Sequence, residues 1–457
     1  MIKNPTNFPS PTEKARMETL QKFNKLYQGE HFSVFGLHEL IKKQFKKPQD
    51  LIYIAQNLTG YISDFYGDFV AGDIDKMIIR GNTGNAEVDK FVDDVVYEND
   101  LKEQVPDMGT DQSIFGFVLL LGWLDTDGGY HISKVGQDQY FPQADGSVIF
   151  TTYKSVTPVN STEAVLYCLT QHYYLENGTC KVDREGWVAN KNGTLEKKIS
   201  FEEITNIFGL NMVENENLEI DELPIRIANN TRLNSYGFGK SDYNDIMPQI
   251  SEINERVSHI ATQLLKNLDA KMALPATDNI DENGDMKNGA FDTIEVNKDE
   301  IMPQYIVNTN NLLTDAREHI SDQIKMVSEI TSVPMWQLTK SSMPERVESL
   351  RIQLFATMRK TSRKRAKIIR ALQDMFRIGF KMKGINFAND IEIAFSDVVP
   401  VDELTQANTE QIKIMAGISS KKSAIMRVEN MDEADAEAEL KQIQDEDRIA
   451  GGLPQIQ

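Results

Sequence analysis

The apolar positions of the first hundred residues recur at helical spacing. Those between residues 20 and 26 lie three positions apart and predict a helix that ends near Gly29. A second helix is predicted over residues 52–69, with its stop signal at Gly72, and a third over residues 86–101. The chain is therefore predicted to open with three helices.

Between residues 114 and 227 the helical spacing gives way to short β-type runs. Apolar and β-branched residues cluster there between turn signals. The runs cover residues 114–124, 148–153, 164–174 and 186–189, and the turn signals are Asp127-Gly128-Gly129, Asp145-Gly146, Asn177-Gly178 and Asn192-Gly193. Because Asn-Gly and Asp-Gly favour tight hairpin turns, the region is predicted to be an antiparallel meander.

From Gly237 the helical spacing returns in two long stretches. Apolar residues between Tyr243 and Leu268 recur every three to four positions and predict a rod of about 40 Å, in which Pro248 marks either a kink or the true start. A second helix is predicted over residues 312–330. The acidic insert between them, residues 270–310, has short strand candidates at 271–274, 291–296 and 304–307.

The apolar stripes of these two helices are longer than one small insert can cover. Packing by neighbouring subunits would bury them, and so would ordinary packing of the two helices within one chain. The candidates for packing between subunits are Ile253, Val257, Ile260, Leu264, Ile320, Ile324 and Val327.

The last part of the chain is again mainly helical. The longest helical pattern covers residues 345–383, a strand candidate follows at 391–395, and residues 402–449 form a further helical segment. With helices towards both ends and strands mainly in the middle, the chain is predicted to have an α+β fold.

Composition narrows the class of protein. The 457 residues include 49 Lys and Arg against 69 Asp and Glu, a net charge of −20, which argues against nucleic-acid binding if the charge is evenly spread. Two cysteines exclude a disulfide scaffold. The longest uncharged apolar run, residues 114–124, is too short to span a membrane, and the N-terminus has no apolar signal core. We therefore expect a soluble protein that is made inside a cell.

The charge, however, is concentrated in one helix. Residues 340–383 contain 13 Lys and Arg against three acidic residues, a net of +10, so the rest carries about −30. A solvated face, pairing with the acidic surplus of a neighbour, and contact with a polyanion all fit this pattern. The candidates for polyanion contact are Lys340, Arg346, Arg359, Lys360, Arg363, Lys364, Arg365, Lys367 and Arg370.

The run Gly237-Phe-Gly239-Lys240-Ser241 is similar to a phosphate-binding loop, since it follows a predicted strand and precedes a helix. That motif needs a glycine where this chain has Asn234. The simpler interpretation is that the glycines bend the chain and that Ser241 or Asp242 caps the helix. A P-loop-like NTPase that uses Gly237–Ser241 is kept as an alternative.

Other candidate chemistry is weaker. Residues 281–292 space oxygen ligands like a calcium loop, but Met286 stands where that loop needs glycine, so a solvated hairpin is preferred. The six histidines show no paired metal spacing, and neither cysteine has the local partners of a nucleophile. We expect no metal, no cofactor and no enzymatic activity.

Four stretches carry a resemblance to a known family: residues 57–72, 114–128, 223–242 and 391–419. In this order they resemble an N-terminal helix, the first wing hairpin, the entry to the first stem helix and the segment before the C-terminal helices. The family is the portal protein of tailed double-stranded DNA bacteriophages. One departure is Ser341-Ser342-Met343-Pro344-Glu345, where many relatives have a Ser-Gly-rich stretch before the tunnel helix.

The resemblance implies an α+β portal architecture of wing, stem, clip, tunnel helix and crown, assembled as a dodecameric ring. The wing would be residues 1–237 and 384–401, the stem 238–269 and 312–332, the clip 270–311, the channel loop 333–346, the tunnel helix 347–383, and the crown and tail 402–457. The channel loop would contain Ser341, Ser342, Met343 and Pro344. The clip would dock partners through Asp281, Glu282, Asp285, Asp292 and Glu295.

The resemblance also implies a function at the unique capsid vertex of a virion, after synthesis in the host cytoplasm. The ring would nucleate procapsid assembly, dock the terminase large subunit and pass double-stranded DNA. It would later join a head-completion adaptor for ejection of the genome. Major capsid and scaffolding proteins are further expected partners, and a membrane is not. A DNA-binding scaffold built on the basic helix is a second alternative.

A DNA channel must not hold its cargo, because phosphate contacts are strong at low salt. We therefore expect the acidic surplus of stem and clip to line part of the passage. We also expect neighbouring groups to neutralise most of the basic helix, so that only some Lys or Arg side chains face DNA.

Overall fold

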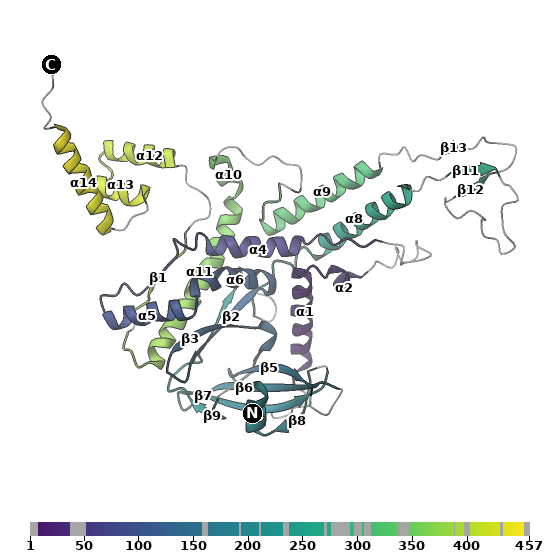
Figure 1. Ribbon diagram of the computed structural model, residues 1–457, viewed down its shortest axis with the longest axis horizontal. Helices are drawn as coiled ribbons and strands as arrows, with labels where there is room; N and C mark the ends of the chain where they lie inside the picture. Colours follow the sequence, from purple (N-terminus) through teal and green to yellow (C-terminus); the bar gives the residue numbers. More distant parts are fainter. Residues whose placement is uncertain are drawn as a thin grey trace, which may run out of the picture. The chain divides into compact units, whose positions relative to one another are not determined.

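The structure is a computed structural model of the chain (Figure 1). It describes residues 8–36, 52–157, 163–191, 193–209, 212–231, 237–268, 272–275, 293–296, 304–305, 312–336, 338, 347–387, 389–396, 403–429 and 433–451. The chain divides into two compact units, Met1–Ser342 with Ala356–Ser396, and Met343–Phe355 with Asp397–Gln457. The larger unit is mixed α+β, as predicted, and the described elements of the smaller unit are helices.

Helices begin the larger unit. They are α1 (Pro11–Tyr27), α2 (His31–Phe35), α4 (Leu58–Ala71), α5 (Ala86–Glu98) and α6 (Leu101–Phe115). The first helix starts after Ser10, whose side-chain oxygen accepts a hydrogen bond from the Glu13 amide. The helices predicted to stop near Gly29 and Gly72 are confirmed.

Two predictions for this region were wrong. The helix predicted from residue 52 begins at Leu58, because the residues before it run extended along α8 (Met247–Leu268). There the amides of Ile52, Ile54 and Gln56 donate hydrogen bonds to the side chains of Thr262, Ser258 and Asn254. Helix α6 was not predicted at all, and it delays the strand expected from residue 114 to Phe117.

Two antiparallel sheets form the middle of the chain, which confirms the predicted meander. A three-stranded sheet has the order β10 (Ile225–Asn229), β2 (Phe117–Leu124) and β3 (Tyr130–Val135). The larger sheet contains β4 (Tyr140–Pro142), β5 (Val148–Val156), β6 (Val165–Glu176), β7 (Thr179–Ala189) and β8 (Leu195–Ile199) in this order, with β9 (Asn215–Asn217) beside β7. Asn177 and Gly178 both have positive φ, 54° and 80°, as the predicted tight turn between β6 and β7 requires.

Two short elements were not predicted. η3 (Gln137–Gln139) connects the two sheets, and α7 (Phe201–Phe208) connects β8 to β9 within the larger sheet. In addition, β1 (Ile78–Arg80) pairs with β14 (Glu392–Ala394), which confirms the strand expected near residues 391–395 and supplies a partner that was not predicted.

The two long helices and their insert agree with the prediction. α8 is followed by β11 (Met272–Pro275), β12 (Thr293–Val296), β13 (Gln304–Tyr305) and α9 (Leu312–Thr331). The three strands form a small sheet with β11 in the centre. Because α8 begins at Met247, Pro248 lies in its first turn and marks its true start rather than a kink.

The longest predicted helix is interrupted. Residues 345–383 contain α10 (Val347–Gln353) and α11 (Phe355–Met382), separated at Leu354. The C-terminal helical segment is confirmed as α12 (Glu403–Met415), α13 (Lys421–Val428) and α14 (Glu433–Gly451).

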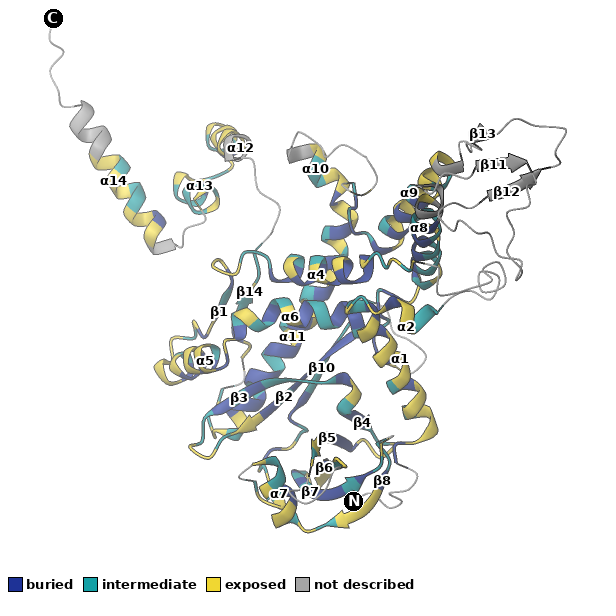
Figure 2. Ribbon diagram, turned by 45° about the vertical axis from the view of Figure 1, so that its right-hand side comes forward, coloured by how far each residue is buried: buried dark blue, intermediate teal, exposed yellow. Residues whose placement is uncertain are grey.

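Two main cores hold the larger unit together (Figure 2). One packs α11 and α5 on the three-stranded sheet through residues such as Phe376 and Phe91. The other joins α4 to α8 and α9 through residues such as Tyr66 and Val327. None of the helices in the described ranges has the length and apolar composition needed to cross a membrane.

Candidate functional site

The basic helix α11 is the strongest functional candidate of the sequence, and its cations fall into two sets. Lys360, Lys364 and Arg365 turn towards the body of the larger unit. The other four described candidates are exposed: Arg359, Arg363, Lys367 and Arg370. Lys340 and Arg346 lie outside the described residues.

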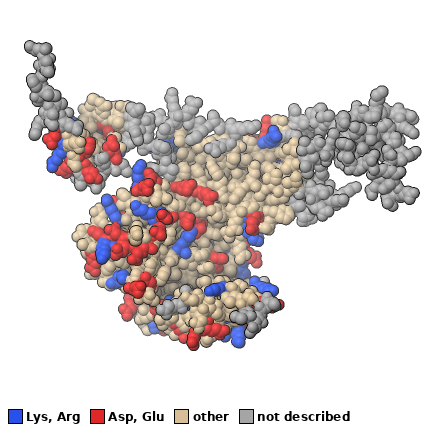
Figure 3. Space-filling view, viewed as in Figure 1, with Lys and Arg blue, Asp and Glu red and all other residues tan. Residues whose placement is uncertain are grey.

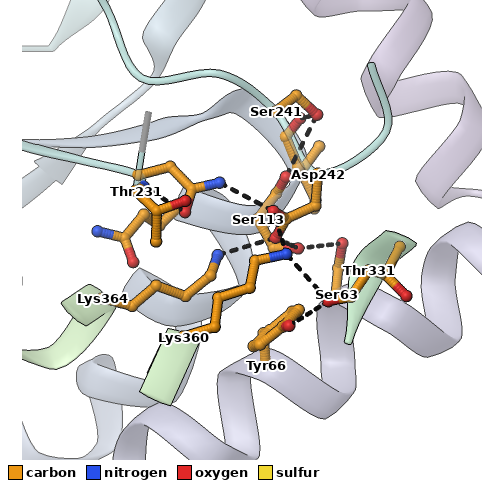
Figure 4. A network of polar contacts seen from close by, with 12 residues as sticks. Ser63, Tyr66, Ser113, Thr231, Ser241, Asp242, Thr331, Lys360 and Lys364 are labelled. Atoms are coloured by element: carbon orange, nitrogen blue, oxygen red, sulfur yellow. Dashed lines mark hydrogen bonds and ion pairs between the residues drawn. The ribbon is translucent and has the colours of Figure 1, made fainter. Parts of the chain in front are cut away.

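The inward lysines share one carboxylate. Lys364 Nζ lies 2.9 Å from Asp242 Oδ2, and Lys360 Nζ lies 3.0 Å from Asp242 Oδ1 (Figure 4). The Lys364 side chain is 0% exposed and that of Asp242 is 5% exposed. Ser113 Oγ and Asn230 Nδ2 donate further hydrogen bonds to the same carboxylate. Every acceptor position of Asp242 is therefore used, as a buried charge requires.

The electrostatics of the cluster follow from this geometry. Burial alone would raise the pKa of Asp242, but the two ammonium groups outweigh it and hold the pKa well below its ordinary value. Burial, aided by the neighbouring Lys360 and opposed by Asp242, lowers the pKa of Lys364 to about 8. Two positive charges are thus packed around a single carboxylate.

The C-terminus of α9 supplies the remaining negative potential. Lys360 Nζ donates a 3.0 Å hydrogen bond to the Thr331 carbonyl, which also accepts one from the Tyr66 hydroxyl. The last carbonyls of a helix carry partial negative charge and have no partners within the helix, so an ammonium group stabilises them. Both ammonium groups also lie over the Tyr66 ring, at 4.8 Å for Lys360 and 4.5 Å for Lys364.

The cluster therefore ties three elements to α11. Asp242 lies in the turn segment just before α8, Thr331 ends α9, and Tyr66 belongs to α4. Arg365 adds hydrogen bonds to the carbonyls of Phe69 and Val70 at the end of α4. The segment before α8 and the end of α9 are therefore both held against the basic helix.

The glycine-rich loop is a packing element and not a phosphate cradle. A Cβ on Gly239 would lie 1.7 Å from the Gly116 carbonyl oxygen, so the two backbones are in direct contact. The Gly239 amide donates to Asn229 Oδ1, and Lys240 Nζ pairs with Asp245 at 2.5 Å. The P-loop interpretation of residues 237–241 is therefore wrong, because the groups that would hold a phosphate are engaged within the chain.

The capping interpretation of the same loop was also wrong. Since α8 starts at Met247, neither Ser241 nor Asp242 can cap it. Ser241 Oγ instead donates to the Ile114 carbonyl and accepts from the Tyr243 amide. The sequence analysis did not predict that Asp242 is the shared counter-ion. The sequence feature that could have indicated a buried ion pair is the position of Lys364 between Thr361 and Ile368, on the buried stripe of its helix.

Some of the predicted polyanion contacts need correction. Lys364 is fully buried and cannot contact DNA in this structure. Lys360 and Arg365 are partly buried and engaged with Asp242 and with backbone carbonyls. Arg359, Arg363, Lys367 and Arg370 remain exposed, and their contact with a polyanion stays a prediction.

Of the two alternatives for the apolar stripes of α8 and α9, packing within the chain accounts for several residues. The side chains of Ile253, Ile320, Ile324 and Val327 are 0–9% exposed and lie in the core that α8 and α9 share with α4. Packing within the chain explains their stripe. Val257 and Ile260 are partly buried against the same core, and Leu264 is 41% exposed.

The remaining candidates give less information. The channel-loop residues Ser341, Ser342, Met343 and Pro344 lie outside the described residues, as do Asp281, Glu282, Asp285 and Asp292 with the calcium-like spacing. Glu295 falls on β12, paired in register with Leu274. Over the described ranges, no group of three His, Cys, Asp or Glu side chains could hold a metal ion. Cys168 and Cys180 are free and buried, and burial raises the pKa of each thiol to about 12.

Comparison with known proteins defines the class. Residues 10–451, nearly the whole chain, match a family of phage portal proteins. That family is described as "Phage portal protein, SPP1 Gp6-like", and this chain belongs to it. The family is structural and non-enzymatic. A search of curated proteins found no match.

Solved structures include one similar chain from a particle described as "Virion of native gene transfer agent (GTA) particle". The similarity covers 86% of this chain and 94% of that chain, at 9% sequence identity and a TM-score of 0.42.

Proposed function

We propose that this portal protein assembles into a ring, with twelve subunits as the expected number, around a passage for double-stranded DNA. The membership of residues 10–451 in the portal family is the observation that carries the proposal. The ring would occupy one vertex of the capsid, nucleate assembly with capsid and scaffolding proteins, and dock the terminase large subunit. A head-completion adaptor would bind later, for ejection of the genome.

The anchoring of α11 supports this proposal. Residues 347–383 would be the tunnel helix, and a helix beside moving DNA must keep its position when the cargo pulls on it. The buried pairs of Lys360 and Lys364 with Asp242 attach it to the start of α8, and the Thr331 carbonyl attaches it to the end of α9. The tunnel helix and stem would therefore resist displacement together.

The charge distribution supports a passage that does not grip DNA. About −30 of charge lies outside residues 340–383. In Figure 3, Asp and Glu side chains gather over α5, where Glu87, Asp93, Asp94 and Glu98 are exposed. Acidic surface repels phosphate and lets a duplex slide, whereas a continuous basic lining would hold it.

Electron microscopy of the purified full-length chain tests the proposal. A ring with a central hole is the expected result. Single particles of 51.8 kDa that persist at high protein concentration would contradict it.

A second candidate is a DNA-binding scaffold that acts as a monomer or dimer through the exposed face of α11. The exposure of Arg363 and Lys367 is the observation that favours it. Filter binding at increasing salt separates the two, because a scaffold that neutralises several phosphates loses affinity steeply with salt.

A further inference from the structure

We infer that the exposed basic face of α11 binds the exposed acidic face of α4 on a neighbouring copy of this chain. The inference rests on the proposed ring and names one of its contacts between subunits. The basic face is Arg363 and Lys367. The acidic face is Asp64 and Asp68.

The basic face has no counter-charge among the described residues. Its two cations lie four residues apart on α11, about 6 Å along the helix. Arg363 and Lys367 are exposed and form no ion pair with another described residue. Arg370, one turn further on, differs because Asp374 and Asp390 already lie 3.5 Å from its guanidinium group.

The acidic face has the same spacing. Asp64 and Asp68 lie four residues apart on α4, and both are exposed. Tyr27 donates a hydrogen bond to Asp64, but Asp68 has no cation beside it among the described residues. Partial burial and the nearby charge of Asp64 both raise the pKa of Asp68, which agrees with an acidic pair that lacks a cation.

The two faces are separate exposed surfaces of one packed pair of helices. Helices α4 and α11 pack against each other through Tyr66 and Lys364 and through the hydrogen bond of Arg365 to Val70 (Figures 1 and 4). Tyr66 and Val70 lie on the buried stripe of α4, and Asp64 and Asp68 on its exposed side. Lys364 likewise lies on the buried stripe of α11, whereas Arg363 and Lys367 are exposed. The packed pair of helices therefore exposes a basic set on α11 and an acidic set on α4.

Each interface in a closed ring of identical subunits joins two different surfaces of neighbouring copies. Two cations and two carboxylates with equal helical spacing can then pair across the interface. Charge complementarity favours a second copy over DNA as the occupant, because every copy carries the matching acidic face.

Charge reversal tests the contact, with full-length variants assayed for ring formation by analytical ultracentrifugation and electron microscopy. One variant carries Arg363→Glu and Lys367→Glu, and the other carries Asp64→Lys and Asp68→Lys. Each variant alone places like charges across every interface, so we expect assembly to need at least a tenfold higher concentration. An equimolar mixture should recover assembly, because an alternating ring restores opposite charges at every interface.

The control carries Lys90→Glu and Lys197→Glu, two exposed lysines on α5 and β8. It changes the net charge as much as the basic-face variant does and should assemble like the wild type. Thermal melts identify any variant that fails to fold, and for such a variant Arg363→Gln with Lys367→Gln replaces the reversal.

The outcomes separate the inference from the proposed function. If the wild type forms rings and the charge-reversed variants assemble equally well, this interface is wrong and the proposed ring remains. The same holds if the equimolar mixture of the two variants does not recover assembly. Variants that assemble normally but lose salt-dependent DNA binding assign the basic face to DNA and also overturn it. A wild-type chain that never forms rings contradicts the proposed function itself.

Discussion

Lys364 Nζ lies 2.9 Å from Asp242 Oδ2, and the lysine side chain has no exposed surface. The two residues are 122 positions apart in the sequence. Their contact joins the basic helix α11 to the segment that leads into α8.

Removing the buried ammonium group should destabilise the larger unit. Lys364→Met leaves the carboxylate with Lys360 as its only ion-pair partner, and we expect a loss of about 3 kcal/mol in the free energy of unfolding. Urea unfolding measures it.

Lys90→Met is the control, since that lysine is exposed on α5. This substitution should change the free energy of unfolding by no more than about 0.5 kcal/mol. Equal effects of the two substitutions would show that the buried ion pair contributes no more to stability than an exposed lysine does.

Acid should weaken this part of the structure through Asp242. The folded-state pKa of Asp242 is depressed, so its contribution to stability is complete above the unfolded value of about 4 and is lost as the pH falls below it. Between pH 5 and pH 2 the stability of the wild type should therefore fall more steeply than that of Asp242→Asn. Parallel curves would contradict the assigned role.

The contact between Gly239 and Gly116 should tolerate no side chain. Gly239→Ala places a methyl group 1.7 Å from a carbonyl oxygen, and we expect a loss of about 3 kcal/mol or more, measured by urea unfolding. Gly84→Ala is the control: Gly84 has φ 74° and nothing within 4 Å of an added Cβ, so only the left-handed backbone costs about 1 kcal/mol. A milder effect at Gly239 than at Gly84 would be evidence against the close packing.

The loop at residues 237–241 should not bind nucleotide. Lys240 pairs with Asp245 near the surface, so Lys240→Ala should change stability by less than about 1 kcal/mol. Isothermal titration of the wild type with magnesium ATP should show no heat of binding at this loop. Binding that disappears in Lys240→Ala would revive the P-loop interpretation.

The elements that the sequence predicted best have strong periodicity. Helices α8 and α9 carry long apolar stripes, and the Asn177-Gly178 pair marks its hairpin, because these signals are local. Helix α6 was missed because Pro106 and many polar residues interrupt its pattern. Residues 52–56 looked helical, and their extended form depends on hydrogen bonds to α8 about 200 positions away.

The sequence predicted which helix carries the candidate site, but not which of its cations are buried. The concentration of Lys and Arg in one helix is visible in the composition of residues 340–383. Which of them face inward depends on Asp242 and Thr331, whose approach to α11 is a product of tertiary folding. The same limit applies to Ile253 and Val327, because an apolar stripe does not show whether α4 or a neighbouring subunit covers it.

A reconstruction of the assembled full-length protein by electron cryo-microscopy tests the proposed function most directly. We predict a closed ring around a passage of acidic or mixed charge, with Arg363 and Lys367 against the next subunit rather than in the lumen. A chain that stays monomeric at high concentration, or a ring whose lumen is lined by Arg359, Arg363, Lys367 and Arg370 together, would contradict that prediction.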